Sequence, residues 1–213
     1  MPAQLYAEGN RRGAWKGQGM ALMDLARAIE ARDPYSSGHA ARVTAIAEVV
    51  AARLGWDEEQ IDVLRIGAAL HDIGKLAVPD TVLRKPGPLN DDEFDHVRAH
   101  PEEGARMLEL VGTLRAAVPC VLHHHERWDG GGYPAGSSGH DIPPGARVLA
   151  VADAFDAMTS DRPYRPALSQ GRAIAELERC AGTQFDPDVV AVFAEAWRQG
   201  ALDPPSGLSL AAS

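Results

Sequence analysis

Apolar residues recur at helical spacing through most of the chain. Pro34 disfavours a helical conformation in the residue before it, Gly55 is typical of a helix end, and Asp57 is a common N-cap residue. Asn90 with Glu93 resembles a capping box. Together these signals predict helices over residues 20–32, 38–55, 58–76, 91–110, 112–127, 145–160, 169–181 and 187–199, with a Pro-rich loop at 78–89.

No segment shows the strict alternation of apolar and polar residues that is typical of strands. The expected fold is therefore all-α, a single helical domain over residues 20–200. Residues 1–19 are rich in Gly and Arg without periodicity and are interpreted as a flexible lead-in. Residues 201–213 are interpreted as a C-terminal tail.

Composition narrows the possible functions. The 213 residues are 45% hydrophobic, enough for a sizeable core, and the net charge of −9 disfavours a nucleic-acid polymer as partner. Two cysteines are too few for a disulfide framework. We expect no signal peptide and no membrane span, because no apolar run is long enough, and we expect a cytoplasmic protein.

Charged residues interrupt two strongly apolar helices. His71 and Asp72 follow the run "VLRIGAAL", with Lys75 one turn later, and Asp153 lies inside "ARVLAVADAF". Burying such groups is costly unless they are paired or bound to a metal ion. If His71 and Asp72 were the only such residues, a buried hydrogen-bonded pair would be the alternative to a metal site. The further histidines nearby favour a metal site.

Seven of the eight histidines lie between residues 71 and 140. Consecutive helical residues are rotated by about 100°, so at most two of His123, His124 and His125 can face one cavity. His39 and His100, taken alone, are ordinary polar residues at helix ends. Imidazoles with carboxylates suit Mn, Fe, Co or Zn, and the absence of a cysteine cluster argues against structural zinc. The pattern favours hydrolysis at phosphorus by a metal-activated water.

The motifs together resemble a known family. "HDIGK" resembles the signature of HD-superfamily phosphohydrolases, and "HHERWDGGGYP", with "DPYSSGH" before it and "ADAFDAMTSDRPYR" after it, closely resembles the HD-GYP subfamily. The resemblance runs from about Asp33 to Pro187. It implies a compact helical bundle with a Gly-rich GYP loop, and a phosphodiesterase that hydrolyses cyclic di-GMP.

The resemblance also implies roles for individual residues. The positions that match metal ligands are His39, His71, Asp72 and Asp153 for one ion and His100, His124 and His125 for the second, with Asp72 bridging. Lys75 matches the lysine beside the attacked phosphate, and the positions that match substrate contacts are Tyr133, Asp156, Arg162 and Arg165. From the residues alone, Asp156 could instead be a helix-packing partner, and each arginine a solvated surface charge.

Two divalent ions are therefore expected, Fe or Mn by the resemblance. Some family members carry a glutamate where this chain has Tyr35, and this glutamate is implied to help hold a third ion and to allow hydrolysis on to GMP. A neutral phenol is a poor ligand, so linear pGpG is the expected product. The alternatives are another HD-type nucleotide phosphohydrolase and a non-catalytic module that senses a dinucleotide or docks a partner. A regulatory protein partner or a homodimer is also compatible with the sequence.

Overall fold

The computed structural model describes residues 14–33, 36–161 and 166–202. Its α-helices are α2 (Ala14–Glu30), α3 (His39–Arg53), α4 (Glu58–Leu70), α5 (Asp80–Leu83), α6 (Asp91–Arg98), α7 (His100–Glu109), α8 (Val118–His123), α9 (Pro144–Thr159), α10 (Gln170–Arg179) and α11 (Pro187–Arg198). Three 3₁₀ segments join them, η1 (Ile73–Ala77), η2 (Gly112–Ala117) and η3 (Gly139–Asp141). Over these residues there is one isolated β-bridge and no strand, which confirms the all-α prediction.

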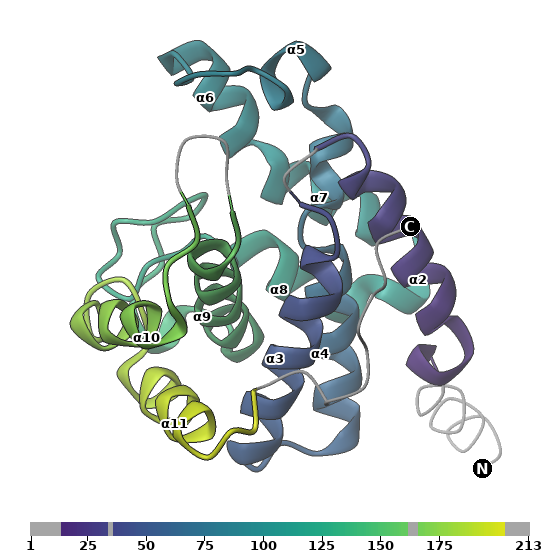
Figure 1. Cartoon of the computed structure of the whole chain (residues 1–213). Helices are drawn as coiled ribbons and strands as arrows, with labels where there is room; N and C mark the ends of the chain where they lie inside the picture. The colour runs from purple at the N-terminus through teal and green to yellow at the C-terminus, as the bar shows by residue number, and fades with distance from the viewer. Residues whose placement is uncertain (1–13, 34–35, 162–165, 203–213) are drawn as a thin grey trace, which may run out of the picture.

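Two apolar clusters meet at α4. One joins α3, α9, α10 and α11 to the face of α4 that carries Leu64 and Ala68, and the other joins α2, α7, η2 and α8 to the face that carries Ile66 and Leu70. Figure 1 shows α3 and α4 at the centre of the molecule, with α10 and α11 on one side and α2 on the other. The C-terminal end of α4 therefore lies where both clusters can support it. Among the described residues, no helix is both long and apolar enough to cross a bilayer.

A group of ion pairs reinforces the packing of α3 on α4. The Arg65 side chain, 12% exposed, pairs with Glu48 at 2.5 Å, Glu58 at 2.8 Å and Asp62 at 2.6 Å. Glu48 belongs to α3, so this contact crosses between the helices. Because Arg65 is largely buried, these pairs are screened by solvent less than fully exposed pairs are, although Glu48 and Glu58 are themselves 41% and 62% exposed.

Several helix boundaries differ from the sequence-based expectations. The first helix begins at Ala14, before Met20 and inside the predicted lead-in. The expected helix 58–76 ends at Leu70 and continues as η1. The expected helix 112–127 is the 3₁₀ segment η2 followed by the short α8, and the expected loop 78–89 contains α5. Helical periodicity reports a turn preference and does not fix where each helix begins and ends.

The 3₁₀ segment η1 that follows α4 packs very closely on α7 at Gly74. A Cβ atom on Gly74 would lie 1.9 Å from the carbonyl oxygen of His100 and 2.6 Å from the backbone nitrogen of Gly104. The backbones of η1 and α7 thus approach so closely that only glycine fits. The same approach brings His100 towards the end of α4.

Replacing Gly74 with alanine should therefore be strongly destabilising. Because both neighbours are backbone atoms that cannot rotate away, we expect Gly74→Ala to lower the free energy of unfolding by about 3 kcal/mol. Gly87 is the matched control, since a Cβ there meets nothing within 4 Å. Urea denaturation should show little change for Gly87→Ala. Equal stability of the two variants would contradict the close approach of η1 and α7.

Candidate metal centre

Three buried histidines at helix ends are held in the same way. In each, the Nδ1 atom faces the backbone carbonyl oxygen three residues earlier, at 2.8 Å for His71, 2.7 Å for His100 and 2.7 Å for His124. A carbonyl oxygen only accepts hydrogen bonds, so each Nδ1 carries the hydrogen. Each Nε2 therefore presents a lone pair when the ring is neutral.

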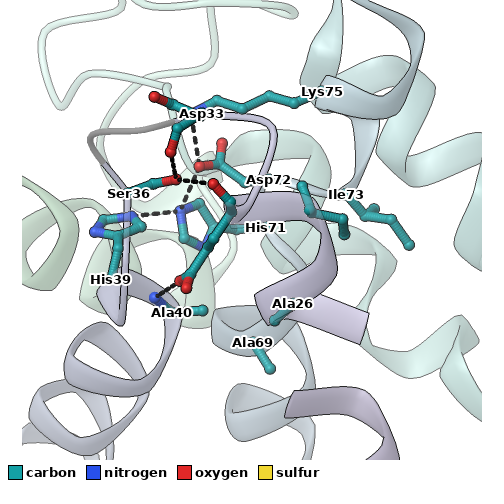
Figure 2. A pocket seen from close by; sticks show the side chains of 12 residues that line it. Ala26, Asp33, Ser36, His39, Ala40, Ala69, His71, Asp72, Ile73 and Lys75 are labelled. Atoms are coloured by element: carbon teal, nitrogen blue, oxygen red, sulfur yellow. Dashed lines mark hydrogen bonds and ion pairs between the residues drawn. The ribbon is translucent and has the colours of Figure 1, made fainter. Parts of the chain in front are cut away.

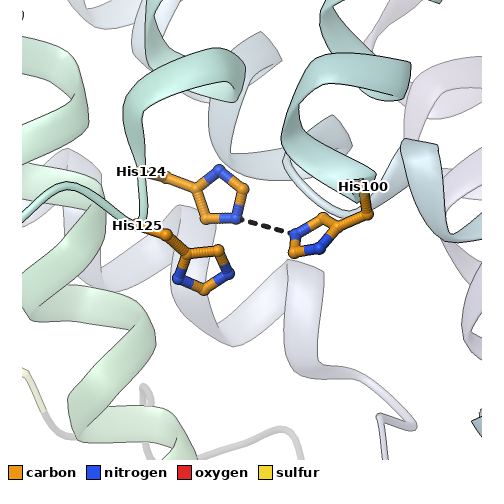
Figure 3. Close-up of side chains that lie close together, drawn as sticks. All are labelled: His100, His124 and His125. Atoms are coloured by element: carbon orange, nitrogen blue, oxygen red, sulfur yellow. Dashed lines mark hydrogen bonds between the residues drawn. The ribbon is translucent and has the colours of Figure 1, made fainter. Parts of the chain in front are cut away.

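These lone pairs face one another. Figure 3 shows His100 and His124 turned towards each other, with their Nε2 atoms 3.1 Å apart and His125 beside them. Burial lowers the pKa of both His100 and His124, which disfavours a proton between the rings. Two lone pairs at this distance repel unless a cation lies between them. The donor set therefore fits a metal ion.

A second pair of rings lies nearby. The Nε2 atoms of His39 and His71 are also 3.1 Å apart. Asp153 places a carboxylate oxygen 3.4 Å from Nε2 of His39. Ligand atoms of His39, His71 and Asp72 lie within 4.8 Å of one another, as do those of His100, His124 and His125. Two neighbouring groups could each hold a metal ion.

Asp72 lies between these two groups. One carboxylate oxygen is 3.4 Å from Nε2 of His100, and the other is 3.6 Å from Nε2 of His71. The second oxygen is also 2.8 Å from Nζ of Lys75. Burial would raise the pKa of Asp72, but Lys75 and the imidazoles outweigh burial and hold this pKa well below its usual range. The carboxylate is thus ionised and placed to reach both groups.

Lys75 sits between two acids. Figure 2 shows its side chain reaching Asp72 and Asp33, and the Nζ–Oδ2 distance to Asp33 is 3.5 Å. Burial would lower the pKa of Lys75, but the two carboxylates outweigh burial and raise it. The ammonium group is therefore charged at neutral pH and lies beside the bridging position.

Asp156 lies behind His39. Its Oδ2 atom is 2.7 Å from Nδ1 of His39, and Arg42 donates to both oxygens at 2.5 and 3.1 Å. The residue is only 3% exposed. A buried carboxylate that accepts the hydrogen on Nδ1 of a histidine fixes the tautomer and orientation of that ring. This geometry is that of an orienting residue; a contact of Asp156 with a dinucleotide stays a prediction.

The two groups open into one cavity of about 220 Å³. Its lining includes the predicted residues His39, Asp72, Lys75, His100, His125, Tyr133, Asp153 and Asp156, and further Asp33, Ser36, Val97, Ala157 and Ser160. His71 and His124 lie in the wall beneath the cavity, both about 1% exposed. The structure thus brings every described candidate residue to one place.

The triple histidine divides as helical geometry predicts. His124 and His125 belong to the group with His100, whereas His123 does not and its Nδ1 faces Glu126 at 3.5 Å. Burial, with smaller effects of neighbouring charges, lowers the pKa of His125 to about 4. All three residues lie at the C-terminal end of α8 or just beyond it.

The Gly-rich loop is folded back against the residues that directly follow α8. A Cβ on Gly132 would lie 2.5 Å from Cα of Glu126, so the chain can pass only as glycine. Glu126 accepts a hydrogen bond from the backbone nitrogen of Ala135 at 2.7 Å. These contacts place the Tyr133 ring 5.0 Å from the ring of His125.

Sequence reasoning missed several residues around the cavity. Arg98 stacks over the Tyr133 ring with its guanidinium carbon 4.8 Å from the ring centroid. Asp33 and Ser36 were part of the quoted "DPYSSGH" motif, which was the available signal, but had no assigned role. Tyr35, Arg162 and Arg165, for which predictions were made, lie outside the described residues.

Comparisons with known proteins agree with this geometry. The cyclic di-GMP phosphodiesterase response regulator RpfG of Xanthomonas campestris is 45% identical over 79% of this chain and 45% of its own length. Cyclic di-GMP phosphodiesterase PA4108 of Pseudomonas aeruginosa is 43% identical over 83% of this chain and 42% of its own length. The chain thus spans less than half the length of these curated relatives.

A solved structure shares the fold. The cyclic GMP-AMP specific phosphodiesterase V-cGAP3 of Vibrio cholerae superposes with a TM-score of 0.67 at 18% identity, over 85% of this chain and 49% of that one. The relatives named as cyclic di-GMP phosphodiesterases are consistent with the HD-GYP resemblance of the motifs. The family model of the HD domain matches residues 24–189, and the chain therefore belongs to the HD domain family.

Proposed function

We propose that this chain hydrolyses cyclic di-GMP to linear pGpG with two divalent ions, Fe or Mn. The observation that carries the proposal is the pair of histidine groups with Asp72 between them at the base of one cavity. The names of the relatives that match most of this chain support the substrate class. A regulatory partner, a homodimer and the domain bounds 1–19, 20–200 and 201–213 remain predictions.

In this proposal the residues divide between two ions. The first would be held by His39, His71, Asp72 and Asp153, and the second by Asp72, His100, His124 and His125. Bound divalent ions would supply positive charge at a phosphate oxygen and lower the pKa of a water molecule. Imidazole and carboxylate donors without thiolates suit Fe or Mn.

The remaining residues of the cavity have roles that follow from their positions. Lys75 is charged and can donate a hydrogen bond to a non-bridging phosphate oxygen beside Asp72. The Tyr133 ring offers a flat apolar face at the cavity wall, on which a base or ribose can pack. Asp156 holds His39 in the tautomer that presents its Nε2 atom. Hydrolysis adds water across one P–O3′ bond and leaves a 5′-phosphate on the linear product.

Product analysis on reconstituted protein tests this proposal. The full chain is freed of metal, reloaded anaerobically with Mn²⁺ or Fe²⁺, and incubated with cyclic di-GMP, cyclic GMP-AMP, cyclic di-AMP, pGpG and guanosine tetraphosphate. We expect two ions per chain and cyclic di-GMP converted to pGpG. Binding of cyclic di-GMP without turnover would favour a sensing module, and turnover of guanosine tetraphosphate alone would favour another HD phosphohydrolase. Three ions per chain, or rapid conversion to GMP, would contradict the role inferred for Tyr35.

The three neighbouring histidines should behave differently from one another. His124→Ala and His125→Ala each remove a ring that groups with His100, so each should lower the bound Mn²⁺ per chain. His123→Ala is the matched control, because this ring faces Glu126 and not the other histidines. Metal content after equilibrium dialysis checks the prediction. Equal loss in all three variants would show that the register of the triple has been misread.

Asp156→Asn separates an orienting role from a substrate contact. If Asp156 orients His39, losing the carboxylate should weaken metal binding by about 10- to 100-fold. If it only contacts the dinucleotide, KM should rise while metal affinity stays unchanged. Mn²⁺ titration in the absence of substrate, followed by kinetics at saturating metal, distinguishes the two. We expect the first result.

A further inference from the structure

The end of α2 and the turn that follows it carry two charged side chains, Glu30 and Arg32, that contact backbone on opposite sides of the group formed by His39, His71 and Asp72. Glu30 accepts hydrogen bonds from the backbone nitrogens of Gly38 at 2.9 Å and Ala40 at 2.7 Å. Figure 2 shows Ala40 directly beside His39 at the start of α3. The two amides flank His39 in sequence, so one carboxylate fixes the backbone on both sides of this histidine.

This contact replaces a missing helix cap. The first amides of a helix have no partner within the helix, and the N-cap residue Gly38 has no side chain to supply one. Glu30 supplies it from another helix, and a negative charge is favourable at this end of α3. The start of α3, and with it His39, is therefore tied to α2.

Arg32 holds the backbone on the other side of this metal group. Its guanidinium group donates to the carbonyl oxygens of Lys75 at 3.2 Å, Leu76 at 3.1 Å and Val78 at 3.1 Å, and to the carboxylate of Asp80 at 2.7 Å. These carbonyls lie at the C-terminal end of η1, which begins directly after Asp72. Carbonyl groups at such an end attract a cation. The segment that carries Lys75 is therefore tied to the turn that directly follows α2.

We propose that Glu30 and Arg32 are positioning residues that together set the first metal pocket from the end of α2. The inference rests on the proposed metal centre. Glu30 sets the place of His39, and Arg32 sets the place of η1 with Lys75. Because the two residues are separated by one position, the end of α2 and the turn after it together fix how far His39 lies from Asp72. The second pocket, formed by His100, His124 and His125, receives no hydrogen bond from either residue among the contacts of the described chain.

Selectivity between the pockets distinguishes positioning from general stabilisation. A residue that only stabilises the fold affects both ions together. A residue that positions His39 changes the affinity for the first ion and leaves the affinity for the second ion unchanged. The test therefore isolates each pocket in turn: His124→Ala disables the second, and His39→Ala disables the first.

Glu30→Gln is the decisive variant, because Gly38 and Ala40 donate to different oxygens of Glu30, and glutamine replaces one of these oxygens with an NH2 group that only donates. In the His124→Ala background, we expect Glu30→Gln to weaken Mn²⁺ binding by about 10- to 100-fold, as for loss of other residues that orient ligands. In the His39→Ala background, it should change Mn²⁺ binding less than twofold. Equal weakening in both backgrounds, or no weakening in the first, would overturn the proposal.

Glu93→Gln is the matched control. Glu93 also accepts from a backbone nitrogen at a helix start, that of Asn90 at 2.8 Å, but it belongs to α6 and not to the metal centre. This variant should keep wild-type Mn²⁺ affinity in both backgrounds. Thermal unfolding of each variant shows whether it is folded under the conditions of the titration.

Arg32→Lys tests the second arm. One ammonium group cannot reach carbonyl oxygens spread over Lys75, Leu76 and Val78 as a guanidinium fork does. We expect Arg32→Lys to lower kcat at unchanged KM, because Lys75 is displaced. Arg115→Lys is the control, because Arg115 donates to the carbonyl of Glu109 away from the cavity, and this variant should keep the wild-type rate. An unchanged kcat in Arg32→Lys would refute the claim that Arg32 positions η1 and Lys75.

The design separates failure of this inference from failure of the proposed function. If the wild-type chain binds two Mn²⁺ ions but does not hydrolyse cyclic di-GMP, the proposed function fails and the titrations with Glu30→Gln still decide the inference. If the wild-type chain binds two ions and turns over substrate while Glu30→Gln matches it in every background, only the inference fails.

Discussion

The structure depends on one unfavourable contact, the approach of neutral imidazole nitrogens to 3.1 Å. At His100 and His124, both Nδ1 atoms donate to backbone carbonyls, so neither ring can donate to the other through Nε2. Burial lowers the pKa of both rings and so opposes a proton between them. A divalent cation turns the same contact from repulsive to favourable. The arrangement is thus explained by metal binding and is costly without it.

The fold is organised to maintain that contact. α4 contributes to both apolar clusters, so its C-terminal end, with His71 and Asp72, is supported from two sides. η1 then turns against α7 at a glycine where no side chain fits, which brings His100 near Asp72. The rings of His39, His71, His100 and His124 stand at helix ends, where backbone carbonyls or a carboxylate can hold a ring without disturbing the packed interior.

Part of this arrangement could be predicted from sequence and part could not. Charged residues within apolar helices indicated His71, Asp72 and Asp153, and the rotation per residue limited the histidine triple to two rings in one cavity, of which the resemblance selected His124 and His125. The resemblance to the HD-GYP family added His39 and His100, which are ordinary by themselves. The partnership of His39 with Asp156, 117 residues apart, and the cap that Glu30 gives to α3 leave no periodic signal. The end of α4 at Leu70 and the close packing of η1 on α7 at Gly74 also escaped prediction.

The central claim is that one carboxylate, that of Asp72, serves two metal ions. Its direct test is the metal content of Asp72→Ala, measured by elemental analysis after anaerobic reconstitution, with helicity followed by circular dichroism. We predict that the variant keeps its helical content, loses both ions and does not hydrolyse cyclic di-GMP. A folded variant that retains two ions per chain, or that turns over substrate at the wild-type rate, would contradict the account.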